Sequence, residues 1–353
     1  MGDTSIMSRT YKLALIGFGN VNRALAQIIV EDGADMATRL GFDLSIVAVS
    51  DLFLGSAYDP NGLDLRGLTT LPAEKEALSR LAGGKTEADN EALIKDSVAD
   101  IVAEATFTDS TTGEPASTHC RWALSSGKHV VTTNKGPAAF HGDDLRALAQ
   151  ENGCQFGIEG TVMSGTPVLR MAQNELKGLN INGFEGILNG TANYILGRME
   201  EGVQLEEAIA EAQSLGYAEA DPTADIEGWD VLLKVVILAE TVLGVRVSPN
   251  QVRREGITGL SSDDVAGAPA DGCRWKLIGK AEVDEDGKVE ASVCPQRLPH
   301  AHPLSGVSGA TNAVAFGTDY LGQVTVSGPG AGRLETGFAL LSDIVAIHQH
   351  SAN

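Results

Sequence analysis

Apolar residues in the first half of the chain follow two alternating patterns. Short runs rich in Val, Ile and Leu predict strands, and longer segments with a helical apolar repeat predict helices. The strands are expected at residues 11–16, 44–49, 100–104 and 128–132, and the helices at about 21–31, 73–81, 89–97, 116–126 and 142–152. Regular alternation of strand and helix predicts a parallel sheet covered by helices.

A different pattern begins near residue 154. Strands are expected near 154–158, 183–188, 278–283 and 289–294, and helices near 167–176, 191–201, 204–215 and 227–243. This order predicts a second α/β domain with a mixed sheet. The last segment ends in an apolar helix over 336–348 that is expected to return to the first domain. We therefore expect one domain of residues 1–153, completed by about 311–353, and another of residues 154–310.

The first strand runs into a glycine-rich turn and then a helix. The turn is Gly17, Phe18, Gly19, Asn20 and Val21. Two glycines let the backbone turn tightly and approach a pyrophosphate, whose charge then lies at a helix N-terminus. The third glycine of such turns is replaced by Asn22, which is expected to push the helix outward. The turn predicts dinucleotide binding, with an α/β turn without a ligand as the alternative.

The choice between NAD and NADP depends on two charged residues. Asp51 follows the second strand, where a carboxylate can accept hydrogen bonds from ribose hydroxyls and would repel a 2′-phosphate. Arg39 lies near the expected end of the first helix, either within reach of such a phosphate or as a cation favoured by the helix dipole. The sequence slightly favours NAD and leaves NADP open.

The segment from Gly216 to Lys234 concentrates charged residues before and within an apolar helix. Asp230 and Lys234 are four residues apart and project from one helix face. The surrounding Val, Leu and Ile residues predict a buried helix, whose charges need partners or a ligand. An ammonium group held among carboxylates can act as a proton donor. The alternative is a surface ion pair worth about 0.3–0.5 kcal/mol.

Composition narrows the class of protein. The 353 residues carry 26 Lys and Arg against 47 Asp and Glu, a net charge of -21, which argues against nucleic-acid or anionic-membrane partners. A surface this acidic suggests a halophilic protein, because concentrated salt screens its self-repulsion. No signal peptide or long apolar span is present, so we expect a cytoplasmic protein. The four cysteines have no metal-ligand spacing and are expected to be buried free thiols.

Six motifs occur in the same order as in homoserine dehydrogenases, which the chain resembles from about residue 10 to 348. They are GFGNV, TTNKGP, EGTVMSGTP, GILNGTANYIL, GYAEADPTADIEGWDVLLK and GPGAG. The resemblance implies a Rossmann-type doubly wound parallel sheet with a second α/β catalytic and dimerisation domain. It also implies NAD(P)-dependent interconversion of L-homoserine and L-aspartate 4-semialdehyde, a step toward threonine, methionine and isoleucine. A homodimer is expected, without an appended regulatory domain.

The same resemblance assigns roles in catalysis and substrate binding. Lys234 would donate a proton in reduction and accept one in oxidation, and Lys135 would contact both substrate and cofactor. Lys135 follows an apolar strand, at the sheet edge where ligands of parallel sheets bind. Glu219 and Asp230 would bind the substrate's ammonium group, with Asp225 as a further contact or as an orienter of Lys234.

The resemblance also implies cofactor and cation contacts. The cofactor contacts would be the turn from Gly17 to Val21 with Asp51, Thr106, Thr132, Lys135 and Gly332. Backbone carbonyls of Glu159, Val162, Ser164 and Thr166 would bind a monovalent cation, Na⁺ or K⁺. The alternative for this segment is a turn without an ion.

Three rival functions remain open at this stage. A phosphorylating semialdehyde dehydrogenase needs an activated cysteine, and none of the four lies in a glycine-rich or histidine-paired setting. An amino-acid dehydrogenase that releases ammonia is a second enzyme class. A non-enzymatic cofactor-binding sensor is the third, and it would not need a proton donor.

Overall fold

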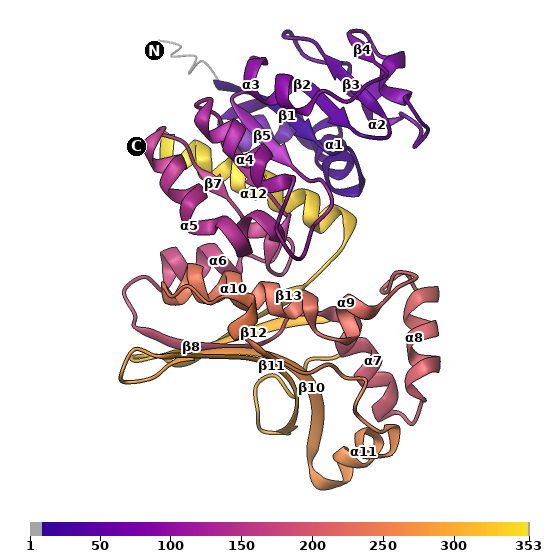
Figure 1. The fold of residues 1–353 in the computed structure, drawn as a ribbon, viewed down its shortest axis with the longest axis vertical. Coiled ribbons are helices and arrows are strands. Elements are labelled where there is room, and N and C mark those ends of the chain that lie inside the picture. Colours follow the sequence, from indigo (N-terminus) through magenta and orange to yellow (C-terminus); the bar gives the residue numbers. More distant parts are fainter. Residues whose placement is uncertain (1–8, 352–353) are drawn as a thin grey trace. The chain divides into compact units, whose positions relative to one another are not determined.

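The computed structural model describes residues 9 to 351, which form two compact units. The first comprises the described residues up to Gly160 together with those from Arg333 onward, and the second runs from Thr161 to Gly332. Figure 1 shows a sheet with helices in each unit. The second unit is therefore inserted between two parts of the first.

The first unit contains a seven-stranded sheet. Its strands are β1 (Arg9–Ile16), β2 (Phe42–Asp51), β3 (Gly55–Tyr58), β4 (Gly84–Lys85), β5 (Ile101–Glu104), β6 (His129–Thr132) and β7 (Phe156–Gly157). They lie in the order β4-β3-β2-β1-β5-β6-β7, and all neighbouring pairs are parallel except those of β3. The strand order reverses between β1 and β5, the place where sheets of this kind bind ligands at the carboxyl ends of the strands.

Helices cover both faces of this sheet. They are α1 (Asn20–Leu40), α2 (Leu65–Thr69), α3 (Asn90–Asp96), α4 (Ala116–Ser125), α5 (Lys135–Glu151) and α12 (Arg333–Ser351). One apolar cluster contains residues of α1 and α12, and a separate cluster contains residues of α3, α4 and α5. Each cluster also contains side chains of β1 and β2, so the sheet has a core on either face. The expected doubly wound fold is confirmed.

The C-terminal helix α12 is part of the first unit's core. It packs on α1, and in Figure 1 this yellow helix lies among the indigo and magenta elements. At Gly337 an added Cβ would lie 2.7 Å from the Cβ of Ala24, so glycine allows the two helices to approach closely. Leu340 and Ile344 are fully buried beside it.

The second unit contains a six-stranded mixed sheet. Its strands are β8 (Ile181–Ile187), β9 (Arg253–Arg254), β10 (Cys273–Val283), β11 (Val289–Pro299), β12 (Thr311–Thr318) and β13 (Gly322–Pro329). The order is β13-β12-β8-β10-β11-β9, antiparallel throughout except between β11 and β9.

The helices of the second unit include one that is almost entirely apolar. They are α6 (Val168–Arg170), α7 (Gly190–Glu200), α8 (Leu205–Ser214), α9 (Thr223–Ile226), α10 (Trp229–Leu243) and α11 (Ser262–Gly267). A Cβ at Gly279 of β10 would lie 2.7 Å from Val235 and 2.8 Å from Val231. Glycine at this position therefore lets α10 lie directly on the sheet, which buries most of the helix.

Several predicted boundaries differ from the structure. The helix expected over 73–81 is wrong: α2 lies earlier, and only a 3₁₀ turn forms at Ala77–Arg80. The strand expected near 154–158 is β7 of the first sheet. Residues 311–332, expected with the first domain, form β12 and β13, because consecutive residues of β12 pair with β8 and β13 pairs with β12 at the edge of the second sheet. Within residues 9–351, no helix has the length and apolar character needed to cross a membrane.

Candidate active site

The charged residues of α10 lie on a buried part of that helix. Lys234 is only 7% exposed. Its Nζ donates to the Oδ2 of Asp230 at 2.7 Å and to the backbone oxygen of Leu188 at 2.7 Å. Gly228, with φ of +78°, ends the preceding turn and starts α10 two residues before Asp230. The alternative of a surface ion pair is wrong, because the side chains of Lys234 and Asp230 are only 9% and 16% exposed.

Asn189 joins the acidic residues into one cluster. It caps α7 through its Oδ1, which accepts from the backbone nitrogen of Ala192 at 2.8 Å. Its Nδ2 donates to Asp225 at 2.6 Å and to Asp230 at 2.9 Å. The sequence reasoning missed Asn189, although an Asn before Gly-Thr at a helix start is a recognisable capping signal. The structure thus brings Asp225, Asp230 and Lys234 together, as expected, whereas Glu219 lies exposed in the segment after α8.

The glycine-rich turn of the first unit has the geometry of a phosphate-binding turn. Gly17 has φ of +78°, and a Cβ there would lie 2.7 Å from the backbone oxygen of Ala105. No larger residue fits this turn. A Cβ at Gly19 would meet no atom within 4 Å, so open space lies beside the N-terminus of α1. Phe18 is buried, and Asn20 is exposed at the first position of the helix. This space and the helix dipole fit the diphosphate of a dinucleotide.

Asp51 holds the turn against the end of β2. Its Oδ2 accepts from the backbone nitrogen of Phe18 at 2.8 Å, and its Oδ1 accepts from those of Phe53 and Leu54 at 2.9 and 3.1 Å. A carboxylate offers about four acceptor positions. Three are used by the protein, which leaves capacity for one hydroxyl donor such as a ribose 2′-OH.

Asn22 stabilises the turn, and the expectation that it pushes α1 outward is wrong. The residue is fully buried. Its Nδ2 lies 2.7 Å from the backbone oxygen of Gly17, 3.1 Å from that of Ala103 and 3.3 Å from that of Ile16. The amide therefore fills the position of the missing glycine and ties the ends of β1 and β5 together. Its Oδ1 is buried without a hydrogen-bond partner.

Arg39 cannot serve the nucleotide turn. Helix α1 runs to Leu40, well beyond the expected end near residue 31, so Arg39 lies at the opposite end of a helix about 30 Å long. Its exposed guanidinium pairs with Asp35 at 3.2 Å. The sequence reasoning missed Arg23, whose guanidinium stacks on Phe18, 4.7 Å from the ring centroid. Burial lowers the pKa of Arg23, while the nearby Asp51 raises it.

The ends of β5 and β6 carry the other expected cofactor residues. Thr106 follows β5 and is half-buried, whereas Thr132 at the end of β6 is fully buried. Asn134 connects the two ends: its Nδ2 donates to the backbone oxygens of Thr106 and Phe107 at 3.2 and 2.9 Å, and its Oδ1 caps α5. Lys135 is the first residue of α5 and is half-buried. Lys135 belongs to the first unit and Lys234 to the second.

The expected cation ligands lie on a tight turn. Met163 and Ser164 have φ of +58° and +52°, an uncommon backbone conformation for residues other than glycine. Val162, Ser164 and Thr166 are buried in the second unit, and Glu159 is buried in the first. The Oγ1 of Thr166 donates to the backbone oxygen of Pro329, beside the Gly328–Gly332 segment.

Two buried groups outside the site have shifted pKa values. Burial lowers the pKa of Lys276 on β10 to about 8, and its Nζ donates to Asn193 at 3.0 Å and to Val307 at 2.6 Å. Burial raises the pKa of the Cys120 thiol well above its usual range. All four cysteines are free, as expected, but only Cys120 and Cys294 are buried, whereas Cys154 and Cys273 are half-buried. Burial raises the pKa of both Cys120 and Cys154, so neither thiol is activated by a lowered pKa.

Comparisons with known proteins decide the family. The homoserine dehydrogenase family model matches residues 167–345, and the model of the family's NAD-binding domain matches residues 17–159. The chain belongs to the homoserine dehydrogenase family. It is 59% identical to an NAD(+)-dependent homoserine dehydrogenase of Pseudomonas canavaninivorans over 96% of both chains.

Solved structures of homoserine dehydrogenases have the same fold. A homoserine dehydrogenase of Thiobacillus denitrificans matches with a TM-score of 0.84 and 30% identity, over 98% of this chain and 75% of that one. A hyperthermophilic archaeal homoserine dehydrogenase mutant in complex with NADPH matches with a TM-score of 0.81 and 29% identity, over 97% and 98%. The first unit contains the NAD-binding domain of the family, and the second contains most of the homoserine dehydrogenase domain.

The chain is therefore an NAD(P)-dependent oxidoreductase that interconverts L-homoserine and L-aspartate 4-semialdehyde. The rival interpretations, a phosphorylating semialdehyde dehydrogenase, an ammonia-releasing dehydrogenase and a cofactor sensor, are not favoured. The buried, high-pKa thiol of Cys120 agrees with this conclusion, because a nucleophilic cysteine has a lowered pKa.

Proposed function

We propose that this homoserine dehydrogenase uses Lys234 as its acid and base, NAD as its preferred cofactor, and the carboxylates beside Lys234 to bind the substrate's ammonium group. One observation carries the proposal: the Nζ of Lys234 is buried and held at 2.7 Å by both Asp230 and the backbone oxygen of Leu188. Two fixed contacts leave the third proton of an ammonium group available for transfer.

The chemistry follows from the charges that change during the reaction. The nicotinamide ring of the bound cofactor supplies or accepts the hydride. In reduction, negative charge develops on the aldehyde oxygen, and Lys234 donates a proton to that oxygen. In oxidation, Lys234 takes the proton of the substrate hydroxyl. Asp230 keeps the ammonium group in one position through both directions, and Asn189 keeps Asp230 in place.

The substrate is an amino acid, so its ammonium group needs carboxylates in the binding site. Asp225 and Asp230 both accept from the Nδ2 of Asn189, and Asp230 also accepts from the Nζ of Lys234, so two carboxylates lie together beside this lysine. We propose that Asp230, Asp225 and the exposed Glu219 bind the substrate's ammonium group, and that Lys135 contacts substrate and cofactor. Replacing Glu219 by Gln should raise KM for homoserine more than it lowers kcat.

The acid-base role is tested by Lys234→Met. We expect kcat to fall about 10²- to 10⁴-fold, because general acid-base catalysis contributes that much, while the Kd for NAD stays unchanged. Lys276→Met is a matched control, since Lys276 is an equally buried lysine of the same unit without a carboxylate partner at its Nζ within the described contacts. Equal losses of kcat in the two variants would contradict the assignment to Lys234.

The cofactor preference follows from Asp51. Its carboxylate is fixed by three backbone amides and faces the position after β2 where the adenosine ribose binds in such folds. A 2′-phosphate there would meet a negative charge, and Arg39 is too distant to offset it. We expect kcat/KM to favour NAD over NADP, and a preference of tenfold or more for NADP would overturn this part of the proposal. Asp51→Asn should reduce the ratio of kcat/KM for NAD to kcat/KM for NADP.

The remaining proposals concern a cation site, the oligomeric state, the cellular location and the metabolic role. The Glu159, Val162, Ser164 and Thr166 carbonyls suit a hard monovalent cation such as Na⁺ or K⁺, because carbonyl oxygens are its preferred ligands. Activity measured with Na⁺, K⁺ and tetramethylammonium at equal ionic strength tests this site. We also propose a homodimer, to be tested by light scattering, a cytoplasmic location, and a role in threonine, methionine and isoleucine biosynthesis.

The net charge of -21 supports a halophilic enzyme. Screening over a few Å at molar salt removes most of the surface repulsion. Assays of homoserine oxidation should therefore include molar KCl, because low salt alone can inactivate an acidic protein of this kind.

A further inference from the structure

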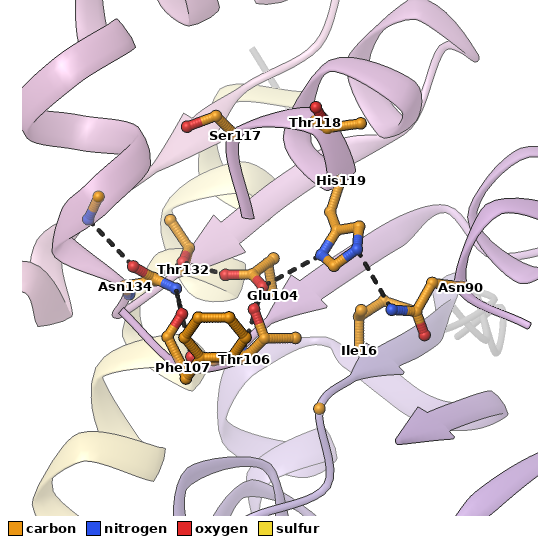
Figure 2. Close-up of polar contacts among 12 residues, drawn as sticks. Ile16, Asn90, Glu104, Thr106, Phe107, Ser117, Thr118, His119, Thr132 and Asn134 are labelled. Carbon is orange, nitrogen blue, oxygen red and sulfur yellow. Dashed lines mark hydrogen bonds and ion pairs between the residues drawn. The ribbon is translucent and has the colours of Figure 1, made fainter. Parts of the chain in front are cut away.

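A buried carboxylate lies beside the expected cofactor residues of the first unit. Glu104 ends β5 and is fully buried. Its Oε1 accepts from the backbone nitrogen of Thr106 at 3.1 Å and from the Thr106 hydroxyl, and its Oε2 accepts from the Thr132 hydroxyl at 3.3 Å. Figure 2 shows these contacts converging on the Glu104 carboxylate. The residue is absent from the sequence motifs and has no assigned role.

His119 completes the surroundings of this carboxylate from α4. Its Nδ1 lies 3.4 Å from the Oε1 of Glu104, and its Nε2 lies 3.2 Å from the Nδ2 of Asn90 (Figure 2). The Oδ1 of Asn90 accepts from the hydroxyl of Ser50 at 2.6 Å, so the network assigns the Asn90 amide as the donor to Nε2. His119 then carries its proton on Nδ1 and donates it to Glu104. The network connects the ends of β2, β5 and β6.

The hydrogen bonds to Glu104 determine whether the two threonine hydroxyls can donate to a ligand or only accept from it. A hydroxyl has one hydrogen, and both Thr106 and Thr132 give theirs to Glu104. Thr132 is buried and also accepts from the backbone nitrogen of Asn134 at 3.0 Å. Thr106 is half-buried, so its remaining lone pairs can meet a ligand. It can then only accept a hydrogen bond, which excludes phosphate and carboxylate oxygens as its partners.

Thr106 lies next to the nucleotide turn. A Cβ at Gly17 would lie 2.9 Å from the backbone nitrogen of Thr106, and β5 is the neighbour of β1 at the point where the strand order reverses. A dinucleotide bound at this point has two kinds of donor on its nicotinamide half, the ribose hydroxyls and the carboxamide amino group. Its diphosphate has none.

We propose that Glu104 is a positioning residue for cofactor binding: it holds the Thr106 hydroxyl as an acceptor for a hydrogen-bond donor on the nicotinamide half of NAD. The inference rests on the proposed use of NAD. Glu104 acts only through Thr106, so the two residues contribute one interaction with the cofactor and not two.

Three variants and their combination test this coupling. Thr106→Val removes the acceptor and should raise the Kd for NAD about 2- to 12-fold, the effect of one hydrogen bond. Glu104→Leu releases the Thr106 hydroxyl and should raise the Kd by a similar factor, and the double variant should show no further loss. Glu104→Gln retains an oxygen toward Thr106 and should restore nearly wild-type affinity. The Kd for NAD, measured by titration calorimetry, is the readout in every variant.

A ligand series with Thr106→Val tests the same idea if Glu104→Leu does not fold. Loss of affinity for NAD but not for ADP-ribose identifies the carboxamide as the donor, and loss for both but not for ADP identifies the ribose. Equal loss for ADP would mean a phosphate contact and would overturn the proposal, as would additive effects of Glu104→Leu and Thr106→Val. An enzyme without any affinity for NAD would instead refute the proposed function on which this inference rests.

Discussion

Asn22 offers the sharpest test of how the nucleotide turn is built. Replacing it by Gly restores the usual third glycine and removes an amide that approaches three backbone oxygens at 2.7, 3.1 and 3.3 Å. If glycine were the better residue, Asn22→Gly should stabilise the turn. The structure predicts the opposite.

The size of the effect follows from the contacts. An amide nitrogen has two hydrogens, so its loss removes two net hydrogen bonds, about 2 kcal/mol. Glycine in the first turn of α1 costs about 0.5 kcal/mol more. Removal of the unpartnered Oδ1 of Asn22 offsets about 1 kcal/mol. We therefore expect the first unit to lose about 1–2 kcal/mol, a fall in its thermal midpoint of about 2–8 °C, since a unit of this size shifts about 2–4 °C per kcal/mol.

Scanning calorimetry of the apo enzyme at fixed salt measures this shift, and titration calorimetry measures NAD binding. Asn22→Gly should also weaken NAD binding several-fold, because the turn that receives the diphosphate loses its tie to β5. Asn22→Asp is the matched variant: its carboxylate faces the same three oxygens without a donor, so it should be less stable than Asn22→Gly at pH 8 and recover toward pH 5. An Asn22→Gly enzyme that melts higher and binds NAD more tightly would refute this account of the turn.

Three other predictions concern pH, salt and thiols. Burial lowers the pKa of Lys276 to about 8, below its value of 10.5 in the unfolded chain, so the unfolded chain binds more protons between these pH values. The free energy of unfolding should therefore rise by about 3 kcal/mol as the pH increases across that window. Lys276→Met should remove this rise in denaturant titrations, and an unchanged dependence of the unfolding free energy on pH would contradict the assignment. The thermal midpoint of the enzyme should increase markedly from about 0.1 M to above 1 M KCl, where the Debye length falls to about 3 Å, and a flat response would remove the case for salt adaptation. Alkylation of the native enzyme should leave homoserine oxidation intact, because Cys120 is buried with a raised pKa; stoichiometric inactivation would revive a thiol mechanism.

Much of the fold could be predicted from the sequence, because short apolar runs and helical apolar repeats identify most of its strands and helices. The strands β1, β2, β5 and β6 are short apolar runs followed by turns, and their parallel arrangement follows from the helices between them. The pairing of β12 with β8 could not be predicted, since it joins residues more than a hundred positions apart. The end of α1 was also missed, because the polar segment before Leu40 has no strong apolar repeat.

The site was predictable where spacing on one helix fixes it. Asp230 and Lys234 are four residues apart on α10, and they form the expected pair. Asn189 and Glu104 were not found, because their roles depend on partners from other elements: Asn189 meets Asp225 of α9 and Asp230 of α10, and Glu104 meets His119 from α4. Buried polar networks of this kind have no periodic signature in the sequence.

The insertion of the second unit between two parts of the first has a consequence for synthesis on the ribosome. Helix α12 supplies part of the apolar core around α1, yet its residues are translated only after the whole of Thr161–Gly332. The second unit can therefore complete its sheet while the first unit still lacks α12. Nascent chains halted before Arg333 should expose the apolar face of α1, a surface suited to chaperone capture, until translation of the last helix covers it.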